Sequence, residues 1–355
     1  MANPALFLGD DYLKAVRLHA YGGVDNLRYE EVDDPQLTSS HDAVVRLKAA
    51  SVNHLDILIR RGLSSTPAPF PHILGSDGSG TISAVGARVT NVKPGDAVCL
   101  YPASSCGRCE FCQAGAEHLC GQRRFLGERE NGTYAEYVRV PASNCYPIPQ
   151  GLSFEEAAAF PLVYATTWRM LVTSAELKPG ESVLILGAGG SIATAALQIA
   201  ASIGAHIIVT SRSDDKLTMA KKLGAEHGIN SRTADFPREV RNLTNKRGVD
   251  VAVDCVGGEG WVKSFAALTK GGRLVTCGAA AGAKSQADLR RLFWNHLKIF
   301  GSMVGSREEF RQVLNFMSTT RTKPIVDQVF SLKDAARAQQ RMEAGQQFGK
   351  IVLSM

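Results

Sequence analysis

The chain has 355 residues, of which 45% are hydrophobic and 21% charged, a composition typical of a folded globular protein and not of a disordered one. This length exceeds what one ordinary hydrophobic core accommodates, which predicts two domains. The formal net charge of +6 suits an anionic ligand such as a nucleotide. The basic residues occur as isolated pairs, however, such as Arg123-Arg124, which favours a solvated surface over a nucleic-acid-binding patch.

Targeting signals are not evident in the sequence. The N-terminal residues lack the basic segment and the long apolar segment of a secretory signal, and we expect 1–13 to form a short, loosely held extension. No apolar run reaches the roughly 18 residues that a membrane helix needs. Eight cysteines, four of them clustered, indicate a reducing compartment, so that the predicted location is the cytoplasm.

The first 150 or so residues are rich in short β-strand patterns that Gly and Pro interrupt. Such spacing favours a Greek-key fold or a partly open barrel. The predicted strands lie within 14–23, 43–52, 78–89, 96–102 and 135–142.

Four cysteines in the run CGRCEFCQAGAEHLC have the spacing of a structural metal site: Cys106, Cys109, Cys112 and Cys120. Four thiolates complete a tetrahedral shell around Zn²⁺ and leave no position for water or substrate, which predicts a structural zinc. Gly107 and Gly115 supply the tight bends that such a lobe needs. The alternatives are an iron–sulfur cluster, whose bacterial signature has a shorter final spacing and a following proline, and disulfides or free thiols.

The remaining cysteines, Cys99, Cys145, Cys255 and Cys277, occur singly in the sequence. Three of them lie in or beside apolar strand-like runs, and none has the electropositive, helix-start setting of a reactive thiolate. Each is therefore interpreted as a small buried hydrophobic residue.

After Pro161 the pattern changes to alternating strands and helices. Uninterrupted apolar strands separated by helices are typical of a doubly wound parallel sheet. The last residues, 348–355, are a strand that is expected to pair back into the first domain. The predicted strands of the second domain lie within 181–187, 206–211, 249–258, 271–279 and 296–305, and the predicted helices within 191–204, 213–225 and 261–268.

A glycine-rich loop, GAGGSIATAA, follows the first strand of this domain and begins a helix. Glycines let the backbone approach a pyrophosphate, and the helix N-terminus offers free N–H groups and a positive dipole end. The preceding strand and following helix supply the context that a dinucleotide loop requires. The candidate coenzyme-binding residues here are Gly189, Gly190, Ser191 and Ile192.

The end of the next strand, Thr210-Ser211-Arg212-Ser213, predicts which coenzyme binds. An NAD-specific loop has a carboxylate here for the ribose 2′-hydroxyl. Instead Arg212 can neutralise a 2′-phosphate, Ser211 can hydrogen-bond it, and Lys216 follows one helical turn later. Asp214 and Asp215 come later, where an N-cap or first-turn acid belongs. NADP(H) is therefore favoured over NAD(H).

The cysteine lobe followed by this nucleotide fold resembles the medium-chain dehydrogenase/reductase superfamily over 14–355. The motifs that carry the resemblance are GSDGSGTISAVG, CGRCEFC, PLVYATTW, LGAGGSIATAALQIA, VDCVGG and FGKIVL. The resemblance implies an α/β fold with a GroES-like catalytic domain, 1–163 and 304–355, whose zinc lobe spans about 99–121. It implies a Rossmann coenzyme-binding domain, 164–303, and a homodimer or homotetramer that pairs through a strand near 296–303.

Zinc alcohol dehydrogenases of this superfamily hold a second, catalytic zinc, but this chain departs from them at all three ligand positions. Asn53, Ser76 and Leu162 stand where the family has Cys, His and Cys. The positions of the family's proton relay are Leu55 and Leu58. A substitute site from His54, Asp56 and Asp77 is disfavoured, because a side chain beside a ligand position commonly points elsewhere. The resemblance therefore implies a structural zinc without a catalytic one.

Without a Lewis acid, an alcohol oxygen has nothing to stabilise its developing charge. Hydride addition to an enone, an enal or a quinone is easier, because conjugation delocalises the charge onto an oxygen that hydrogen-bond donors can stabilise. Asn53 to Asp56 and PLVYATTW also resemble the quinone oxidoreductase and double-bond reductase branches. The alternatives are an alcohol or aldehyde dehydrogenase with an unusual site and a non-catalytic NADPH-binding sensor.

The resemblance also implies roles for single residues. Asn53 is the leading cleft donor, with a brace for the backbone as its alternative, and Asp56 orients its neighbours. Tyr101 lines the pocket or donates a proton, which solvent can supply instead. Trp294 lines the cavity, contacts a second subunit or packs in the core. The positions that the family places near the nicotinamide or the phosphates are His54, Thr166, Val256, Cys277, Gly278 and Lys350.

Overall fold

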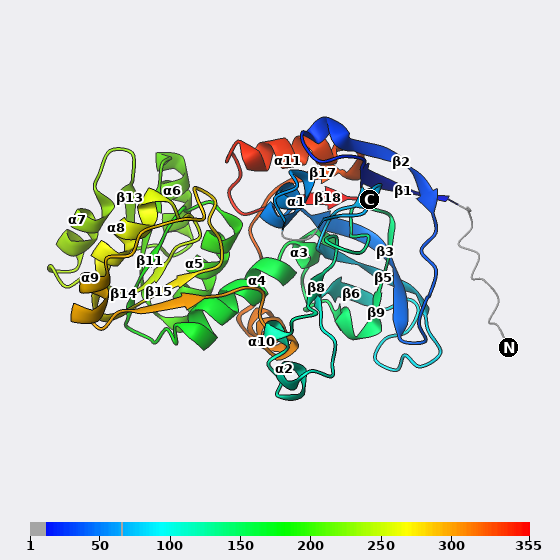
Figure 1. Ribbon diagram of the computed structural model, residues 1–355, viewed down its shortest axis with the longest axis horizontal. Coiled ribbons are helices and arrows are strands. Elements are labelled where there is room, and N and C mark those ends of the chain that lie inside the picture. Colours follow the sequence, from blue (N-terminus) through cyan, green and yellow to red (C-terminus); the bar gives the residue numbers. More distant parts are fainter. Residues whose placement is uncertain (1–11, 65–66) are drawn as a thin grey trace. The chain divides into compact units, whose positions relative to one another are not determined.

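The computed structural model describes residues 12–64 and 67–355, and the chain divides into two compact units (Figure 1). Unit 1 is Met1–Leu162 with Lys323–Met355, and unit 2 is Val163–Thr322. Residues 304–322, which the domain prediction assigned to the catalytic domain, lie in unit 2. The expected N-terminal extension falls mostly outside the described residues, except that Tyr12 and Leu13 already belong to the first strand.

Unit 1 consists mainly of short strands with a few short helices. Its strands are β1 (Tyr12–Leu18), β2 (Leu27–Asp33), β3 (Asp42–Ser51), β4 (His72–Ile73), β5 (Asp77–Val85), β6 (Ala97–Leu100), β7 (Ala103–Ser104), β8 (Arg124–Phe125), β9 (Tyr137–Pro141), β10 (Cys145–Pro147), β17 (Val326–Ser331) and β18 (Lys350–Ser354). Its helices are η1 (Val24–Asn26), α1 (His54–Arg60), α2 (Glu110–Gln113), η2 (Glu117–Leu119), η3 (Ala142–Asn144), α3 (Phe154–Ala158), η5 (Leu332–Asp334) and α11 (Ala335–Glu343).

The C-terminal strand β18 lies between β3 and β17 in the large sheet of unit 1. That sheet has the order β10-β6-β5-β3-β18-β17, with β9 also paired to β3. Val352 of β18 lies opposite Ser51 of β3 in an antiparallel register. The prediction that the last residues pair back into the first domain is therefore confirmed. Smaller sheets, β2-β1-β4 and β7-β8, complete the unit.

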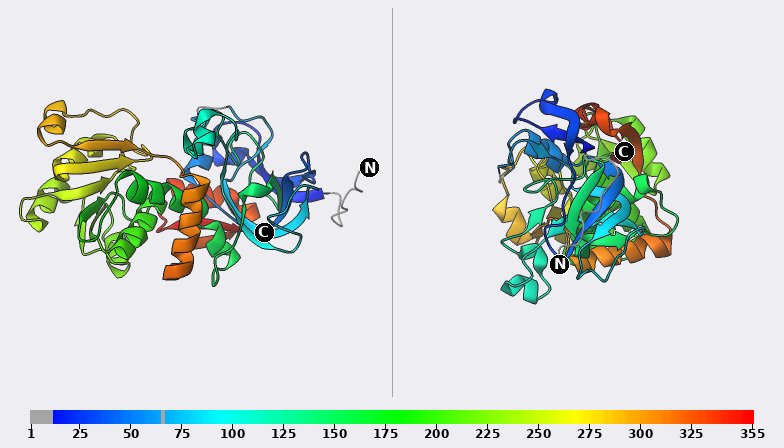
Figure 2. Two further views of the ribbon diagram at one scale, coloured as in Figure 1. Left: turned by 90° about the horizontal axis from the view of Figure 1, so that it is seen from below. Right: turned by 90° about the vertical axis from the view of Figure 1, so that its right-hand side faces the viewer.

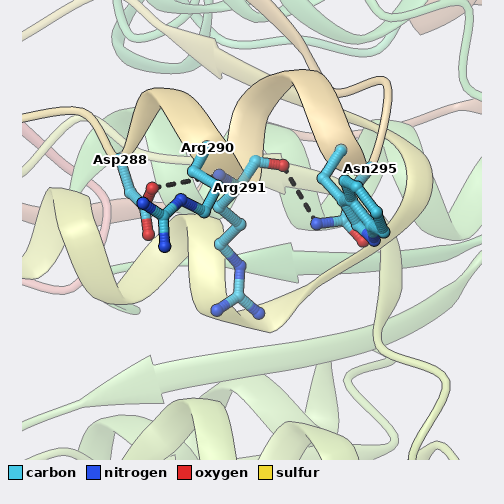
Figure 3. Close-up of a pocket in the computed structure, with 5 residues that line it drawn as sticks. Asp288, Arg290, Arg291 and Asn295 are labelled. Atoms are coloured by element: carbon cyan, nitrogen blue, oxygen red, sulfur yellow. Dashed lines mark hydrogen bonds between the residues drawn. The ribbon is translucent and has the colours of Figure 1, made fainter.

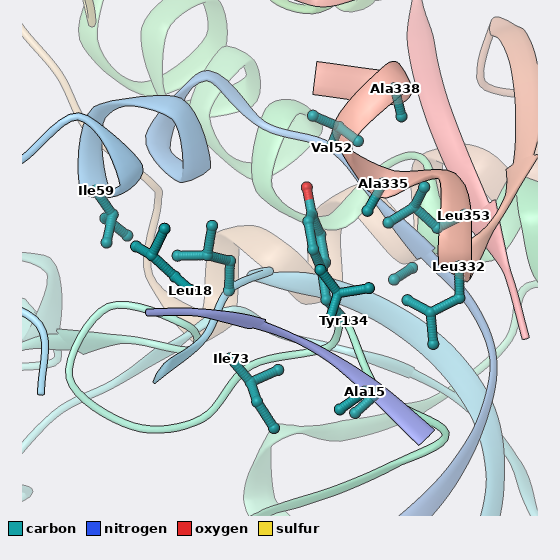
Figure 4. Close-up of a cluster of buried hydrophobic side chains, with 14 of the residues drawn as sticks. Ala15, Leu18, Val52, Ile59, Ile73, Tyr134, Leu332, Ala335, Ala338 and Leu353 are labelled. Atoms are coloured by element: carbon teal, nitrogen blue, oxygen red, sulfur yellow. The ribbon is translucent and has the colours of Figure 1, made fainter. Parts of the chain in front are cut away.

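The core of unit 1 joins segments that are far apart in the sequence (Figure 4). Tyr134 is fully buried among Ala15 of β1, Val52, and Ala335 and Ala338 of α11. Such contiguous burial of apolar side chains is the main favourable term in folding. Val52 lies just before α1, and the Tyr134 hydroxyl donates to Asp56 in its first turn. The same core therefore also fixes the start of this helix, where Asn53 and Asp56 lie.

Unit 2 contains a six-stranded, fully parallel sheet with helices between its strands (Figures 1 and 2). The sheet order β13-β12-β11-β14-β15-β16 has a switch point beside β11, which confirms the predicted doubly wound architecture. Its strands are β11 (Ser182–Ile185), β12 (His206–Ser211), β13 (His227–Asn230), β14 (Val249–Val253), β15 (Leu268–Thr276) and β16 (Lys298–Gly301). Its helices are α4 (Pro161–Trp168, which begins in unit 1), η4 (Arg169–Ser174), α5 (Ser191–Ile203), α6 (Asp214–Lys222), α7 (Phe236–Leu243), α8 (Glu259–Ala267), α9 (Leu289–Trp294) and α10 (Arg307–Thr320).

Local sequence explains where the long helices begin and end. Gly190 precedes α5 in an extended conformation, and Gly204 ends it with φ of 83°, a left-handed conformation that glycine adopts without strain. The Ser306 hydroxyl caps α10 by accepting from the Glu309 N–H, and the Glu309 carboxylate accepts in turn from the Ser306 N–H. No helix in the described residues is both long and apolar enough to cross a membrane.

Side-chain contacts show why α10 belongs to unit 2. The buried Glu309 carboxylate accepts bonds from the Arg169 guanidinium at 3.0 Å and from the Thr173 hydroxyl at 2.6 Å. Trp168 donates its indole N–H to Gln312 at 2.9 Å and packs its ring against Phe316. These contacts hold α10 against α4 and η4, so residues 304–322 lie in unit 2 although they precede a unit 1 segment.

Candidate active site

The four clustered cysteines bring their sulfur atoms together at the lobe between β7 and β8. The Sγ atoms of Cys106, Cys109, Cys112 and Cys120 all lie within 4.8 Å of one another. Cys109 and Cys112 are 3.5 Å apart, and Cys106 and Cys112 are 3.8 Å apart. Zn–S bonds of about 2.3 Å place tetrahedral sulfurs about 3.8 Å apart, so the donor set fits zinc.

The backbone of the lobe also prepares it for thiolates. Gly107 and Gly115 have φ of 70° and 73°, so the bends are at the glycines expected from the sequence. Backbone N–H groups of Arg108 and Cys109 stabilise the Cys106 thiolate and lower the pKa of that thiol to about 6. Stabilising the ionised form favours metal binding, because only the thiolate is a ligand.

In unit 2, the predicted coenzyme residues lie at the carboxyl ends of four neighbouring strands. The glycine loop follows β11, Ser211 ends β12, Val256 follows β14, and Gly278 follows β15. These strands are adjacent in the sheet order β12-β11-β14-β15. Ligands of open α/β sheets bind outside this edge at the switch point, which here lies beside β11.

The glycine loop has the backbone conformation that its sequence predicts. Gly187 and Gly189 have φ of 74° and 100°, which residues with a Cβ rarely adopt. A Cβ on Gly187 would lie 3.5 Å from Cγ2 of Val256, so the loop passes close to the end of β14. Ser191 and Ile192 begin α5, and the positive dipole end of a helix N-terminus is suited to a phosphate.

The end of β12 presents a polar side chain next to a cationic one. Ser211 is buried, and its hydroxyl accepts from the Ser213 N–H at 3.2 Å, whereas Arg212 is exposed. Ser213 is the N-cap of α6 and accepts from the Lys216 N–H. Asp214 and Asp215 lie in the first turn of α6, as expected, and Asp214 accepts from Asn230 at 2.8 Å.

A buried carboxylate that the sequence analysis did not single out organises the end of β14. Asp254 is fully buried, and its Oδ1 accepts from the N–H groups of Val256 and Gly257, both at 2.9 Å. Its Oδ2 accepts from the Ser264 hydroxyl at 2.8 Å. Asp254 therefore positions Val256. The motif VDCVGG contains this residue, but only the fold shows that its carboxylate folds back onto the following turn.

In unit 1, Asn53, Asp77 and Lys350 form a buried polar cluster. Asn53 donates from Nδ2 to Asp77 Oδ2 at 2.8 Å and accepts at Oδ1 from Lys350 Nζ at 2.6 Å. Lys350 Nζ also reaches Asp77 Oδ2 at 3.2 Å and the carbonyl of Val52 at 3.1 Å. Both polar atoms of the Asn53 side chain thus bind within the protein, which supports the bracing role.

Lys350 is a buried lysine whose ammonium group is held by oxygen atoms of unit 1. Its side chain is 2% exposed, and desolvation lowers the pKa of the ammonium, while the Asp77 carboxylate opposes that shift. Lys350 was expected near the nicotinamide or the phosphates of the coenzyme, and its Nζ binds three oxygen atoms of unit 1. The Asp77 carboxylate is occupied in turn, because it also accepts from Ser51 and from the Leu162 N–H.

The three positions of the family's catalytic zinc do not form a metal site here. Asn53 is held by Lys350, and Ser76 donates its hydroxyl to the Leu126 carbonyl at 2.8 Å. The Leu162 side chain has no metal-binding atom, and its backbone N–H binds Asp77. Within the described ranges, the cysteine lobe is the single group of three or more Cys, His, Asp and Glu side chains with metal-binding geometry. The donor set at Asn53, Ser76 and Leu162 does not fit zinc.

Asp56 is a buried acid with an incomplete set of partners. Its Oδ2 accepts from the Asn53 N–H at 2.8 Å and from the Tyr134 hydroxyl at 3.0 Å. Oδ1 has no hydrogen-bond partner among the described residues. Burial raises the pKa of this carboxyl to about 7, against the opposing effect of these donors and of Lys350. Asp56 therefore orients the start of α1, as expected. The sequence analysis did not identify Tyr134.

The remaining candidates lie in different settings. His54 is exposed at the start of α1, and desolvation followed by the charge of Arg61 lowers its pKa. Tyr101 is 2% exposed, and its hydroxyl accepts from Arg123 at 3.2 Å, which favours packing over proton donation.

Thr166 is buried in α4. Burial is confirmed for Cys99 and Cys145, but that prediction is wrong for Cys255 and Cys277, which are partly exposed.

Trp294 does not pack in the core, because 72% of it is exposed. It lines a hollow of about 390 Å³ along α9, together with Asp288, Arg290, Arg291 and Asn295 (Figure 3). Asp288 accepts from the Arg291 N–H at 3.0 Å, and Asn295 donates to the Arg291 carbonyl at 2.9 Å. These bonds cap and close the short helix. They do not assemble acid–base groups for catalysis.

Comparison with known proteins agrees with this architecture. Residues 39–150 match the alcohol dehydrogenase GroES-like domain, and residues 191–319 match the zinc-binding dehydrogenase family. A zinc-type alcohol dehydrogenase-like protein of Schizosaccharomyces pombe is 34% identical, over 94% of this chain and 96% of its own length. The NAD-dependent alcohol dehydrogenase of Sulfolobus acidocaldarius is 32% identical, over 97% and 100%.

A solved structure of an NAD-dependent alcohol dehydrogenase superimposes with a TM-score of 0.93 at 42% identity, covering 96% of this chain and 99% of that one. A GroES-like unit combined with a Rossmann-type sheet defines a class of two-domain oxidoreductases. Within this class, the chain belongs to the medium-chain dehydrogenase/reductase superfamily.

Proposed function

We propose that the chain is an NADP(H)-dependent oxidoreductase that transfers hydride to an activated C=C bond of an enone or enal, or to a quinone, without a catalytic zinc. The observation that carries this proposal is the cluster at Asn53. There, an internal ammonium from Lys350 binds the residue at the first ligand position, and Asp77 accepts from both. A zinc ion beside that ammonium would be repelled by it.

The reaction class follows from this lack of a Lewis acid. NADPH, when bound, supplies the hydride. The residues of unit 2 bind and orient it: the α5 N-terminus for the pyrophosphate, and Ser211 and Arg212 for the 2′-phosphate. An enone or quinone carries the developing charge on its own carbonyl oxygen. Because Asp56 and Tyr101 are buried, we infer that solvent supplies the proton.

The zinc proposal concerns the lobe alone. Cys106, Cys109, Cys112 and Cys120 would hold one Zn²⁺ with four sulfur ligands, where the ion supports the fold and takes no part in the reaction. Support comes from the sulfur distances and from the match to a zinc-binding dehydrogenase family. The cytoplasmic location stays a prediction.

The second candidate function is oxidation of an alcohol, because the three relatives named above are called alcohol dehydrogenases or alcohol dehydrogenase-like, two of these three NAD-dependent. Two measurements on the purified protein separate the candidates. Our proposal predicts about one zinc per chain and NADPH consumption with a panel of enones, enals and quinones. Two zincs per chain together with chelator-sensitive reduction of NAD⁺ by alcohols would overturn it. Tight NADPH binding without turnover on any substrate would favour a sensor.

We also propose that two chains pair through β16. This strand is at the end of the sheet order, and β15 is its partner within the described part of unit 2. Large apolar side chains around it are exposed: Leu289, Phe293, Trp294, Ile299 and Met303. An exposed apolar strand edge is a site for pairing with another chain.

A further inference from the structure

Cys255 and Cys277 are separate in the sequence but adjacent in the structure. The strands β14 and β15 are parallel neighbours with Val253 opposite Val275, and each cysteine lies two residues beyond the valine of its own strand. The common register places the cysteines side by side, and their Sγ atoms are 3.3 Å apart. Both residues are partly exposed, in contrast to Cys99 and Cys145.

The backbone holds the two cysteines in this arrangement. The Asp254 N–H donates to the Val275 carbonyl at 3.0 Å, and the Ala280 N–H donates to the Cys255 carbonyl at 3.4 Å. Neighbouring strands lie about 4.8 Å apart, within the Cα separation of about 4.4–6.8 Å that a disulfide spans. The sulfurs need to approach by roughly 1.2 Å to reach the bonded distance of about 2.05 Å, which side-chain rotation can supply.

We propose that Cys255 and Cys277 form a thiol-modification site that a low-molecular-weight disulfide, such as oxidised glutathione, converts into an intramolecular disulfide. Cys277 releases its thiol proton to solvent, and its sulfur attacks one glutathione sulfur, which forms a mixed disulfide and expels one glutathione thiolate. Cys255 then releases its proton to solvent, and its sulfur attacks Cys277 and expels the second glutathione thiolate. The protein loses two electrons, and one oxidised glutathione becomes two reduced molecules.

The electrostatics of the pair support this order of attack. The hydrogen bond with Cys277 and desolvation raise the pKa of the Cys255 thiol well above its usual range, so Cys255 keeps its proton during the first step. When the Cys277 sulfur enters a mixed disulfide, that hydrogen bond no longer favours the protonated form of Cys255. Cys255 can then ionise more easily and act as the resolving thiol.

The dithiol lies at the sheet edge where the proposed function places the coenzyme, and this part of the inference rests on that function. Val256 and Gly278 directly follow the two cysteines, and a Cβ on Gly278 would lie 3.8 Å from the Cys255 Cβ. A coenzyme bound at this edge would cover the thiols. Oxidation and coenzyme binding should therefore oppose each other, because oxidation requires exposed thiols and a bound coenzyme would cover them.

Peptide mapping tests the disulfide. The reduced protein is incubated with oxidised glutathione, quenched in acid, alkylated and digested with trypsin. Residues 248–263 and 274–284 are separate tryptic peptides with one cysteine each, and the expected product is the two linked by a disulfide. Unlinked peptides, or a glutathione adduct that persists on Cys277, would overturn the proposal.

Variants identify the roles of the two thiols. Cys255→Ser removes the resolving sulfur, so a stable glutathione adduct should accumulate on Cys277. Cys277→Ser should leave Cys255 largely unmodified over the same time, and rapid modification of Cys255 would contradict the order of attack. Cys145→Ala, which removes a buried thiol of unit 1, is the matched control and should form the same linked peptides as the natural chain.

A parallel incubation with NADP⁺ separates this inference from the proposed function. At about one hundred times its Kd, only about 1% of the chains are free, so disulfide formation should slow by about tenfold or more. If the linked peptides form at the same rate with NADP⁺, the proposed dithiol site stands and the proposed coenzyme position is wrong. Unlinked peptides in both incubations would overturn the dithiol site, whatever the coenzyme does.

Discussion

Asp56 is a titratable group whose pKa is raised by burial in the core of unit 1. The carboxyl is fully buried, and burial raises its pKa from 3.8 to about 7. A buried acid with a raised pKa binds its proton more tightly in the folded state than in the unfolded chain. Its contribution therefore becomes unfavourable as the pH rises from about 4 to about 7, by about 4 kcal/mol over the whole interval.

The substitution Asp56→Asn should remove this pH dependence, since an amide resembles the protonated acid and keeps an oxygen for Asn53 and Tyr134. Between pH 5 and pH 8, unit 1 of the natural chain should lose about 3 kcal/mol more stability than the variant. Urea unfolding at several pH values measures the difference. Asp25→Asn, at an exposed acid, is the control, and equal slopes for Asp56→Asn and the natural chain would contradict the prediction.

Arg212 should determine the coenzyme preference at the end of β12. Its exposed guanidinium can form charge-assisted hydrogen bonds with a 2′-phosphate, and such bonds contribute about 1.5–3 kcal/mol. Arg212→Ala should therefore raise the KM for NADPH by about tenfold to a hundredfold and change that for NADH little. Arg238→Ala, at an exposed arginine of α7, is the matched control. An unchanged ratio of the two KM values in Arg212→Ala would contradict the assignment.

At the scale of elements, the cysteine lobe depends on its metal more than the other parts of unit 1 do. Between β7 and β8 it contains two short helices, α2 and η2, and none of the residues in these helices is buried. With so little apolar burial, the sulfur–zinc bonds would supply most of its folding energy. The rest of unit 1 has its own hydrophobic clusters.

Cys109→Ser should consequently reduce the zinc content from about one ion per chain to nearly none and unfold the lobe locally. Elemental analysis measures the zinc, and limited trypsin digestion should cleave at Arg108 and Arg123 faster than in the natural chain. Cys145→Ala, outside the lobe, should keep its zinc and its resistance to trypsin. Retention of stoichiometric zinc in Cys109→Ser would contradict the four-cysteine site.

Patterns that are local in the sequence predicted the elements well. Apolar strands alternating with helices, the glycine loop and the cysteine spacing each act within about 15 residues, and the structure has a parallel sheet, left-handed glycines and clustered sulfurs at these places. The contacts of the candidate site are not local. Lys350 reaches Asn53 across 297 residues, and no periodicity signals that pairing.

Two further features depended on tertiary structure in the same way. Cys255 and Cys277 become neighbours only through the register of β14 and β15, so each looked like a single buried thiol in the sequence. From the sequence, the side chain of Asn53 was the leading candidate for a donor in the cleft, but in the structure Asp77 and Lys350 bind both of its polar atoms. In both cases the residue type indicated a functional or structural role, but the interaction partner could be identified only from the tertiary structure.

At the scale of the whole molecule, the proposed pairing through β16 explains why apolar side chains remain exposed around α9 and β16. Trp294 is 72% exposed and Ile299 is 41% exposed, although both are large and apolar. Pairing of β16 with the same strand of a second chain would satisfy its open edge and cover both residues. The predicted coenzyme loop follows β11, which is separated from β16 by two strands, so pairing should leave it accessible within unit 2.

The double substitution Trp294→Ala and Ile299→Lys should therefore dissociate the oligomer, because it removes the most exposed of these apolar side chains and places a charge on the edge strand. Light scattering after size-exclusion chromatography should show a lower mass for the variant than for the natural chain at the same concentration. Val329→Lys, which alters an exposed apolar residue on β17, the end strand of the large unit 1 sheet, is the matched control and should keep the natural mass. NADP⁺ affinity should be unchanged in both proteins. If the double variant keeps the natural mass, or if Val329→Lys dissociates instead, β16 is not the edge through which the chains pair.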